Sequence, residues 1–165
     1  MPKIKIFISS VQREFAKERR MITDYITNDA LLGKFFEVFI FENIAAQDRK
    51  PYDVYIDEVN KSEIYIGLFG KQYGFLLENG ISPTECEFDA ATFCNKYRII
   101  FLLNSKESER HPKMNLLINK ASDCLVYGSF PVNISLKFSL ISSYFGSSTA
   151  IALMLFLFLF WKILE

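Results

Sequence analysis

The sequence predicts a three-layer α/β fold, in which helices cover both faces of a parallel five-stranded sheet with the strand order 2-1-3-4-5. Short apolar segments alternate along the chain with segments of helical periodicity. Several of the apolar segments are hydrophobic at nearly every position, which is typical of parallel strands buried on both faces. A chain of 165 residues fits one such domain and leaves little room for a second.

The first strand–helix unit is predicted at the start of the chain. Residues 3–9, K-I-K-I-F-I-S, alternate β-branched residues with others and predict a strand. Residues 11–28 predict a helix, because their apolar residues recur at spacings near three and four and so form one face. The second strand is predicted over residues 35–41, F-F-E-V-F-I-F, an almost uninterrupted apolar segment.

The rest of the chain repeats this alternation. Proline suits the first turn of a helix, and three of the later helices are predicted to begin at one. The later elements are a helix over 51–60, a strand over 64–70, a helix over 83–95, a strand over 98–103, a helix over 112–120 and a strand over 124–127. A sheet with this order belongs to the flavodoxin-like type.

Ligands of such sheets bind outside the carboxyl ends of the strands, where the strand order reverses between the first and third strands. We therefore expect substrate-binding residues directly after the strands and before the following helix. These residues are Ser9, Ser10, Phe41, Gly70, Tyr73 and Ser82. For Ser9 an alternative is a capping box with Gln12, and glycines after a strand also serve turns.

The segment G-I-S-P-T-E-C-E-F-D-A-A, residues 80–91, contains two glutamates with different predicted roles. Ser82 and Glu85 fit the two ends of a capping box, so Glu85 is expected to fold back onto the Ser82 amide. Glu87 lies about 200° around the helix from Glu85, at 3.6 residues per turn, and must point elsewhere. Glu87 is therefore the candidate catalytic carboxylate.

The composition indicates a cytosolic domain without a resident metal or other cofactor. Lys plus Arg equals Asp plus Glu at 19 each, so the overall charge predicts no direct binding of nucleic acid. The three cysteines, Cys86, Cys94 and Cys124, lack zinc-type spacing and are expected to be reduced, buried thiols. The single histidine, His111, precedes a proline, and a role at the start of a helix is expected for it.

Two segments, S-E-I-Y-I-G-L-F-G-K-Q-Y-G and S-P-T-E-C-E-F-D-A-A, resemble the third strand, loop and following helix of TIR-like domains. K-I-F-I-S-S-V-Q-R-E-F resembles the start of a TIR-like family of unknown function, and R-H-P-K-M continues the resemblance. The match covers about residues 3–143. Domains of that family often precede DNA-binding or ATPase regions.

The resemblance implies a function. In catalytic TIR domains and in nucleoside deoxyribosyltransferases, the glutamate of E-hydrophobic-x-x-A acts at the ribose carbon that bears the base, and Glu87 matches it. This implies a signalling or defence module that binds an NAD-like nucleotide, self-associates and cleaves the N-glycosidic bond. Catalytic TIR domains commonly carry Trp-Cys before that glutamate, whereas this chain has Thr84, Glu85 and Cys86. Two alternatives therefore stay open, a non-catalytic interaction or sensor module and nucleotide binding without turnover.

The segment after the domain is strongly apolar. The domain is predicted over residues 1–143, ending in an amphipathic helix, and the apolar C-terminal segment over 144–165. A helix within 145–163 would anchor the cytosolic domain to a membrane, since about 20 mostly apolar residues span a bilayer. The alternative is a truncated or frameshifted gene that leaves a tail foreign to the fold.

Overall fold

The computed structural model describes residues 2–30, 32–40, 51–122, 126–129 and 137–140. Along the chain, strands and helices alternate as the sequence predicts. The elements are β1 (Ile4–Ser10), α1 (Gln12–Asn28), α2 (Leu32–Phe35), β2 (Phe36–Phe39), α3 (Pro51–Lys61), β3 (Ile64–Phe69), α4 (Pro83–Phe93), β4 (Tyr97–Leu102), a 3-10 turn (Glu107–Glu109), α5 (Pro112–Ser122), β5 (Val126–Ser129) and β6 (Lys137–Leu140).

The four central strands are parallel and have the predicted order, β2-β1-β3-β4. The prediction that a fifth strand pairs in parallel with the fourth is wrong. Beside β4 lies β6, which is antiparallel to β4, and β5 pairs antiparallel with β6 at the outer position. The sheet is therefore mixed, as sheets with an antiparallel edge often are.

The chain after α5 was predicted as a strand over 124–127 followed by an amphipathic helix that includes residues 137–140. In the structure 137–140 is the strand β6 instead. Its sequence, K-F-S-L, alternates polar and apolar residues with the period of a strand. Pairing this segment with β4 supplies hydrogen bonds to an edge that would otherwise be open, which explains why the strand replaces the helix.

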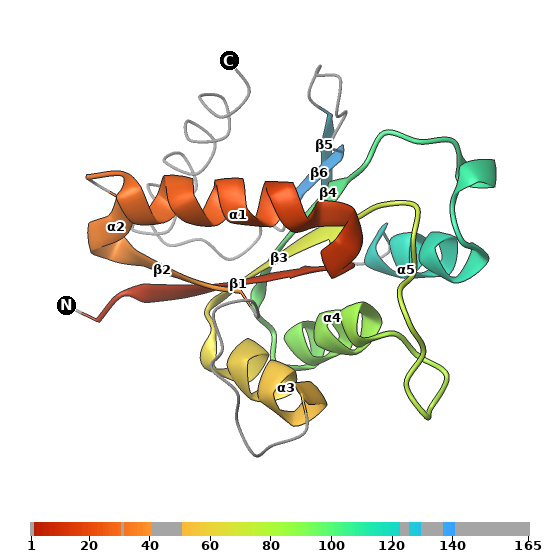
Figure 1. The fold of residues 1–165 in the computed structure, drawn as a ribbon, viewed down its shortest axis with the longest axis horizontal. Coiled ribbons are helices and arrows are strands. Elements are labelled where there is room, and N and C mark those ends of the chain that lie inside the picture. The colour runs from red at the N-terminus through yellow and green to blue at the C-terminus, as the bar shows by residue number, and fades with distance from the viewer. Residues whose placement is uncertain (1, 31, 41–50, 123–125, 130–136, 141–165) are drawn as a thin grey trace.

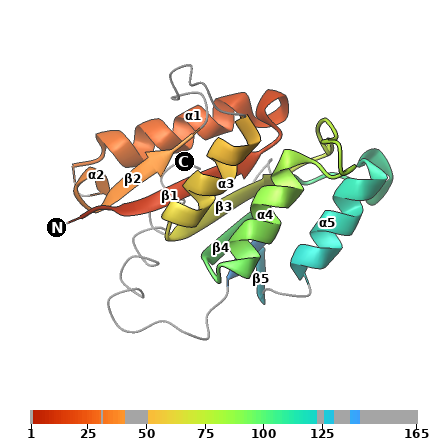
Figure 2. The ribbon, with the colours of Figure 1, turned by 90° about the horizontal axis from the view of Figure 1, so that it is seen from below.

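Helices cover both faces of the sheet, with α1 on one side and α3, α4 and α5 on the other (Figures 1 and 2). The alternation of side chains along β1 divides the core between these faces. Ile6 and Ile8 pack with Phe15 and Ile22 of α1. Phe7 faces the other way, in a cluster with Phe88 of α4 and residues of α5. β1 thus packs against helices on both faces of the sheet.

The two pairings of β1 bring the carboxyl ends of the central strands together. Ser9 lies opposite Gly67 of β3 and Ser10 lies opposite Leu68, at the position where the chain leaves both strands. The helix α4 packs across β1 and β3 from below in Figure 1. The first turns of α1 and α4 therefore meet at this edge of the sheet.

The expectations for the cysteines and for the C-terminal segment have different outcomes. Cys86 is buried, but Cys94 is exposed and donates to Asn60 Oδ1 over 3.2 Å, so the prediction of buried thiols is wrong for Cys94. Cys124 lies outside the described residues. Residues 145–163 also lie outside them, and within the described part of the chain no helix is long and apolar enough to cross a membrane.

Candidate functional site

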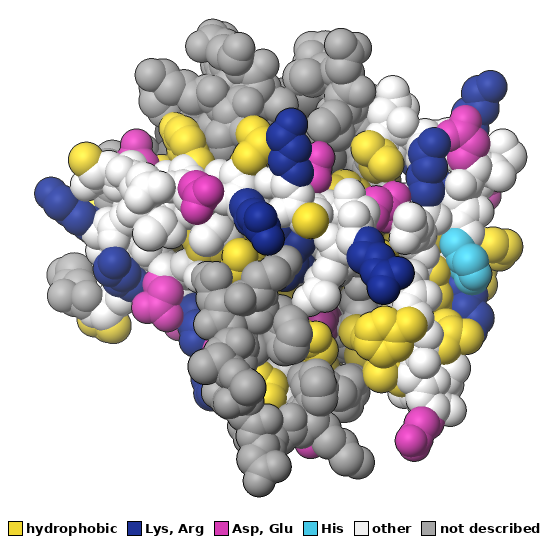
Figure 3. All heavy atoms as spheres, viewed as in Figure 1, with side chains coloured by type: hydrophobic (Ala, Val, Ile, Leu, Met, Phe, Trp, Pro, Cys, Tyr) yellow, Lys and Arg dark blue, Asp and Glu magenta, His cyan; other side chains and the backbone are white. Residues whose placement is uncertain are grey.

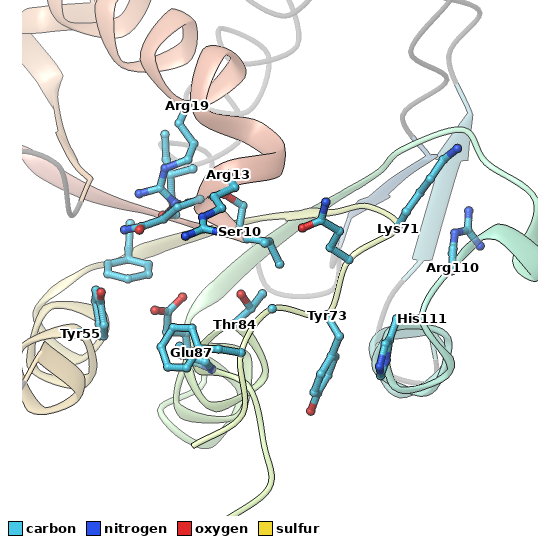
Figure 4. Close-up of a pocket in the computed structure, with 18 of the residues that line it drawn as sticks. Ser10, Arg13, Arg19, Tyr55, Lys71, Tyr73, Thr84, Glu87, Arg110 and His111 are labelled. Atoms are coloured by element: carbon cyan, nitrogen blue, oxygen red, sulfur yellow. Dashed lines mark hydrogen bonds between the residues drawn. The ribbon is translucent and has the colours of Figure 1, made fainter. Parts of the chain in front are cut away.

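A cavity of about 790 Å³ opens at the carboxyl ends of β1 and β3 (Figure 4). Its volume lies in the range of about 300 to 1,000 Å³ that small-molecule sites usually have. The walls come from the start of α1, the loop after β3, the first turns of α4 and the loop before α5. The lining residues include Ser10, Arg13, Arg19, Tyr73, Glu87 and Arg110.

Glu87 is the buried carboxyl of this cavity. Only 6% of the residue is exposed, and its side chain points across the cavity toward α1 in Figure 4. Ser9 at the end of β1 is fully buried, and its hydroxyl donates to Glu87 Oε2 over 2.5 Å. The structure thus brings together two predicted site residues that are 78 positions apart in the chain.

Burial dominates the protonation of Glu87. Removal from water disfavours the charged form and raises the pKa of Glu87 from 4.5 to about 7, even though the Ser9 hydroxyl and the nearby charge of Arg19 act in the opposite direction. Such a carboxyl exchanges its proton near neutral pH. Strongly perturbed carboxyls in cavities are frequent at functional sites, which makes Glu87 a candidate on physical grounds as well.

Tyr65 of β3 lies close enough to Ser9 and Glu87 to interact with both. Its hydroxyl is buried and makes no hydrogen bond of good geometry with a described residue. Burial, and then the charge of Glu87, raise the pKa of Tyr65, while the neighbouring Ser9 hydroxyl acts against them. Tyr65 therefore stays protonated and supplies a neutral hydroxyl near the Glu87 carboxyl group.

The middle of α1 contributes a buried arginine. Arg19 Nη1 donates to the Ile8 carbonyl over 3.1 Å and to Ser10 Oγ over 3.2 Å, so it fixes the end of β1 and the Ser10 hydroxyl. The N-cap of α1 is Val11, which makes no side-chain cap hydrogen bond. The alternative of a capping box from Ser9 to Gln12 is wrong, because the Ser9 hydroxyl donates to Glu87 instead.

The helix cap of α4 is built partly as predicted. Ser82 is fully buried and its hydroxyl accepts from the Glu85 amide over 3.2 Å. The predicted return bond from Glu85 to the Ser82 amide is wrong, because Tyr73 takes that place. Ser82 N donates to the Tyr73 hydroxyl over 3.3 Å, and this hydroxyl donates to Glu85 Oε2. Lys120 Nζ donates to the other oxygen, Glu85 Oε1, over 3.2 Å. Both oxygens of Glu85 therefore have partners within the protein, and its role is structural.

Tyr73 also joins the cavity to α5. It is 3% exposed, and its ring stacks on His111 with centroids 5.5 Å apart. His111 Nδ1 accepts from the Lys113 amide over 3.2 Å, which confirms the expected role of His111 at the start of a helix. The loop after β3 is held on one side by α4 and on the other by α5.

Gly70 lies where the carboxylate of Glu14 approaches the backbone. A Cβ at Gly70 would be 2.4 Å from that carboxyl group. Glu14 accepts from the amides of Lys71 over 2.6 Å and of Gln72 over 3.1 Å. The glycine thus allows α1 to fasten the loop after β3, and Gly70 does not line the cavity described above.

Besides Glu87, the cavity is lined by charged residues that the sequence gives no reason to expect there, which are Arg13, Arg19, Lys71, Glu109 and Arg110. On a helix or loop such residues look like ordinary solvated charges. Of the predicted site residues, Phe41 lies outside the described residues. Within the described ranges, no group of three or more His, Cys, Asp or Glu could hold a metal ion.

The fold and the cavity together define an α/β domain that has a cavity of ligand size and a buried carboxyl group at the carboxyl edge of its parallel strands. The chain belongs to the family described as a domain of unknown function (DUF4062), whose model matches residues 5–127. The family description does not include the TIR-like resemblance.

One solved structure that matches is the CMP N-glycosidase BcmB of Clostridium botulinum. The two chains are 14% identical with a TM-score of 0.40, and the match covers 72% of this chain and 98% of that chain. A TM-score at this level is too low to support an inference from that protein to this chain. A search of curated proteins gave no significant match.

Proposed function

We propose that this domain binds a nucleotide in the cavity and hydrolyses its N-glycosidic bond, with Glu87 at the ribose and NAD as the first substrate to test. The observation that carries the proposal is the buried carboxyl of Glu87, which faces a cavity of ligand size while Ser9 holds one of its oxygens. The segment Glu87 to Ala91, which fits E-hydrophobic-x-x-A, supports the same role by resemblance.

Cleavage breaks the bond between the ribose carbon C1′ and the nitrogen of the base, and the bonding electron pair leaves with the base. Positive charge develops on the ribose, and a preorganised carboxylate in a site of low dielectric stabilises it. A water oxygen then bonds to C1′ and releases a proton. For a nicotinamide nucleotide the base leaves neutral, so no acid is needed to protonate it.

In this proposal the two oxygens of Glu87 have separate tasks. Oε2 accepts from Ser9, which fixes the side chain. Oε1 makes no hydrogen bond with the described residues and is available to the ribose or to the attacking water. A carboxylate whose pKa is about 7 can take up the proton of that water near neutral pH. Only the ionised form performs these steps, so cleavage should increase as the pH rises through about 7.

Release of nicotinamide from NAD tests the proposal. Wild type should release it, and Glu87→Gln should lose this activity because the amide keeps the shape but not the charge. The matched control is Asp89→Asn, which removes a carboxylate two residues along α4 whose partner is Lys120 rather than the cavity. Equal release by wild type and Glu87→Gln, or none by wild type, would count against the proposal.

A further inference from the structure

The walls of the cavity carry four cationic side chains, and three of them are already engaged by the protein. Arg19 is buried against the end of β1, where its guanidinium donates to a carbonyl and to a hydroxyl. Arg110 donates to the Ser105 hydroxyl over 3.0 Å and to a backbone carbonyl over 3.2 Å. Lys71 forms an ion pair of 2.5 Å with Glu109. These three cations have structural partners.

Arg13 is the fourth and differs from the others. It is exposed in the first turn of α1, and no described residue forms an ion pair or a hydrogen bond with it. A cation in the first turn opposes the helix dipole, so this arginine does not stabilise α1. An anion bound in the cavity would give Arg13 a partner and would account for its position.

The positions of the charges fix where such an anion can lie. In Figure 4, Arg13 comes from α1 on one side of the cavity and Glu87 comes from α4 on the other, while Lys71 and Arg110 lie toward α5. On the face of the molecule in Figure 3, lysine and arginine side chains also lie along α1. A phosphate is repelled by the Glu87 carboxylate. Lys71 and Arg110 already have partners in the protein, so the phosphate should lie on the α1 side, next to Arg13.

From this pattern we propose that Arg13 binds the phosphate of the ligand, and that the site takes 5′-phosphorylated nucleotides in preference to nucleosides. The inference rests on the proposed function, because Glu87 is taken as the ribose end of the ligand. Arginine suits the task, since its planar guanidinium donates two parallel hydrogen bonds to phosphate oxygens. A nucleoside would leave Arg13 without a partner.

Three ligands with the same glycosidic bond test the proposal: nicotinamide riboside, nicotinamide mononucleotide and NAD. They carry no phosphate, one phosphate and two. Calorimetric titrations in the Glu87→Gln background, where no turnover is expected, should show the mononucleotide binding at least about tenfold more tightly than the riboside, as expected for one charge-assisted contact. Inorganic pyrophosphate, which lacks base and ribose, serves as a second probe.

Arg13→Gln should remove about tenfold of the affinity for the mononucleotide and for pyrophosphate, and it should leave the riboside unaffected. Arg13→Lys keeps the charge and should retain part of the preference. The control is Arg20→Gln, which removes an exposed arginine of the same helix that does not line this cavity. Its affinities should match those of the background protein.

The outcomes separate this inference from the proposed function. If the phosphate preference depends on Arg13 but wild type cleaves none of the three ligands, the phosphate site stands and the proposed hydrolysis fails. If wild type cleaves the riboside as well as the mononucleotide and Arg13→Gln changes neither, hydrolysis stands and the phosphate site is refuted. Absence of binding by every ligand and by pyrophosphate also refutes it.

Discussion

Replacing Glu87 by glutamine should make the protein much more stable at pH 8 and only slightly more stable at pH 5. In the folded state burial raises the pKa of Glu87 from 4.5 to about 7. At pH values well below 4.5 the carboxyl is protonated in both the folded and the unfolded state and does not lower the free energy of unfolding. Between the two values the unfolded chain ionises first, so the stability of the wild type falls as the pH rises through about 7.

The size of the effect follows from the same two values. The difference between 4.5 and about 7 corresponds to about 3 kcal/mol of unfolding free energy, at about 1.4 kcal/mol for each pH unit. Glutamine is neutral at every pH and escapes this cost, while it keeps the volume and an oxygen that can accept from Ser9. The gain of Glu87→Gln should therefore grow from about 1 kcal/mol at pH 5 toward about 3 kcal/mol at pH 8.

Urea denaturation of both proteins at pH 5, 6, 7 and 8 measures the difference, provided that unfolding is two-state. Subtraction of the two curves removes the titration of every other group. Asp89→Asn is the control, since Asp89 is 41% exposed in its side chain and pairs with Lys120 at 2.5 Å, so its loss should give no gain at pH 8. A gain that does not change with pH, or a wild type more stable than Glu87→Gln at pH 8, would refute the reasoning.

Three further predictions concern neighbouring residues. Glu85→Ala should lower the free energy of unfolding by about 1 to 2 kcal/mol in urea, because it removes the acceptor of Tyr73 and Lys120. Activity per folded molecule should survive. An inactive but equally stable variant would contradict the role assigned to Glu85. Ser9→Ala should raise the pKa of Glu87 above about 7, because the lost hydroxyl stabilises the carboxylate. A titration midpoint of Glu87 that stays the same or falls would show that the Ser9 hydroxyl does not donate to this carboxylate. Gly70→Ala should lower the free energy of unfolding by about 1 to 2 kcal/mol, because the added Cβ displaces the Glu14 carboxylate from the Lys71 and Gln72 amides. Unchanged stability in urea would argue that this contact is unimportant.

Elements with strong local signals could be predicted from the sequence. The helix start at Ser82 and Pro83 has a cap written in consecutive residues, and the structure begins α4 at Pro83 with Ser82 as N-cap. The meeting of Ser9 and Glu87 followed from topology, because the carboxyl ends of the first and third strands must share one edge. Strand order and edge were enough to join residues far apart in the chain.

Contacts that depend on distant residues could not be predicted in this way. The Ser82 amide bonds to Tyr73 rather than to Glu85, and the local pattern of a capping box holds no sign of a tyrosine from the preceding loop. The antiparallel strand β6 is four residues long, and so short a segment fits a helix or a strand until its partner β4 is known. Arg13 looked like a solvated helix residue because its position beside the cavity is a tertiary fact.

The most direct test of the account is an NMR titration of the Glu87 side-chain carboxyl carbon, assigned by comparison with Glu87→Gln, with and without nicotinamide mononucleotide. The account predicts a midpoint at about pH 7 in the free protein and a change in the Glu87 resonance when the nucleotide binds. A midpoint near the ordinary value of 4.5, together with a resonance that does not respond to the nucleotide, would contradict the claim that Glu87 is the buried carboxyl of a nucleotide site.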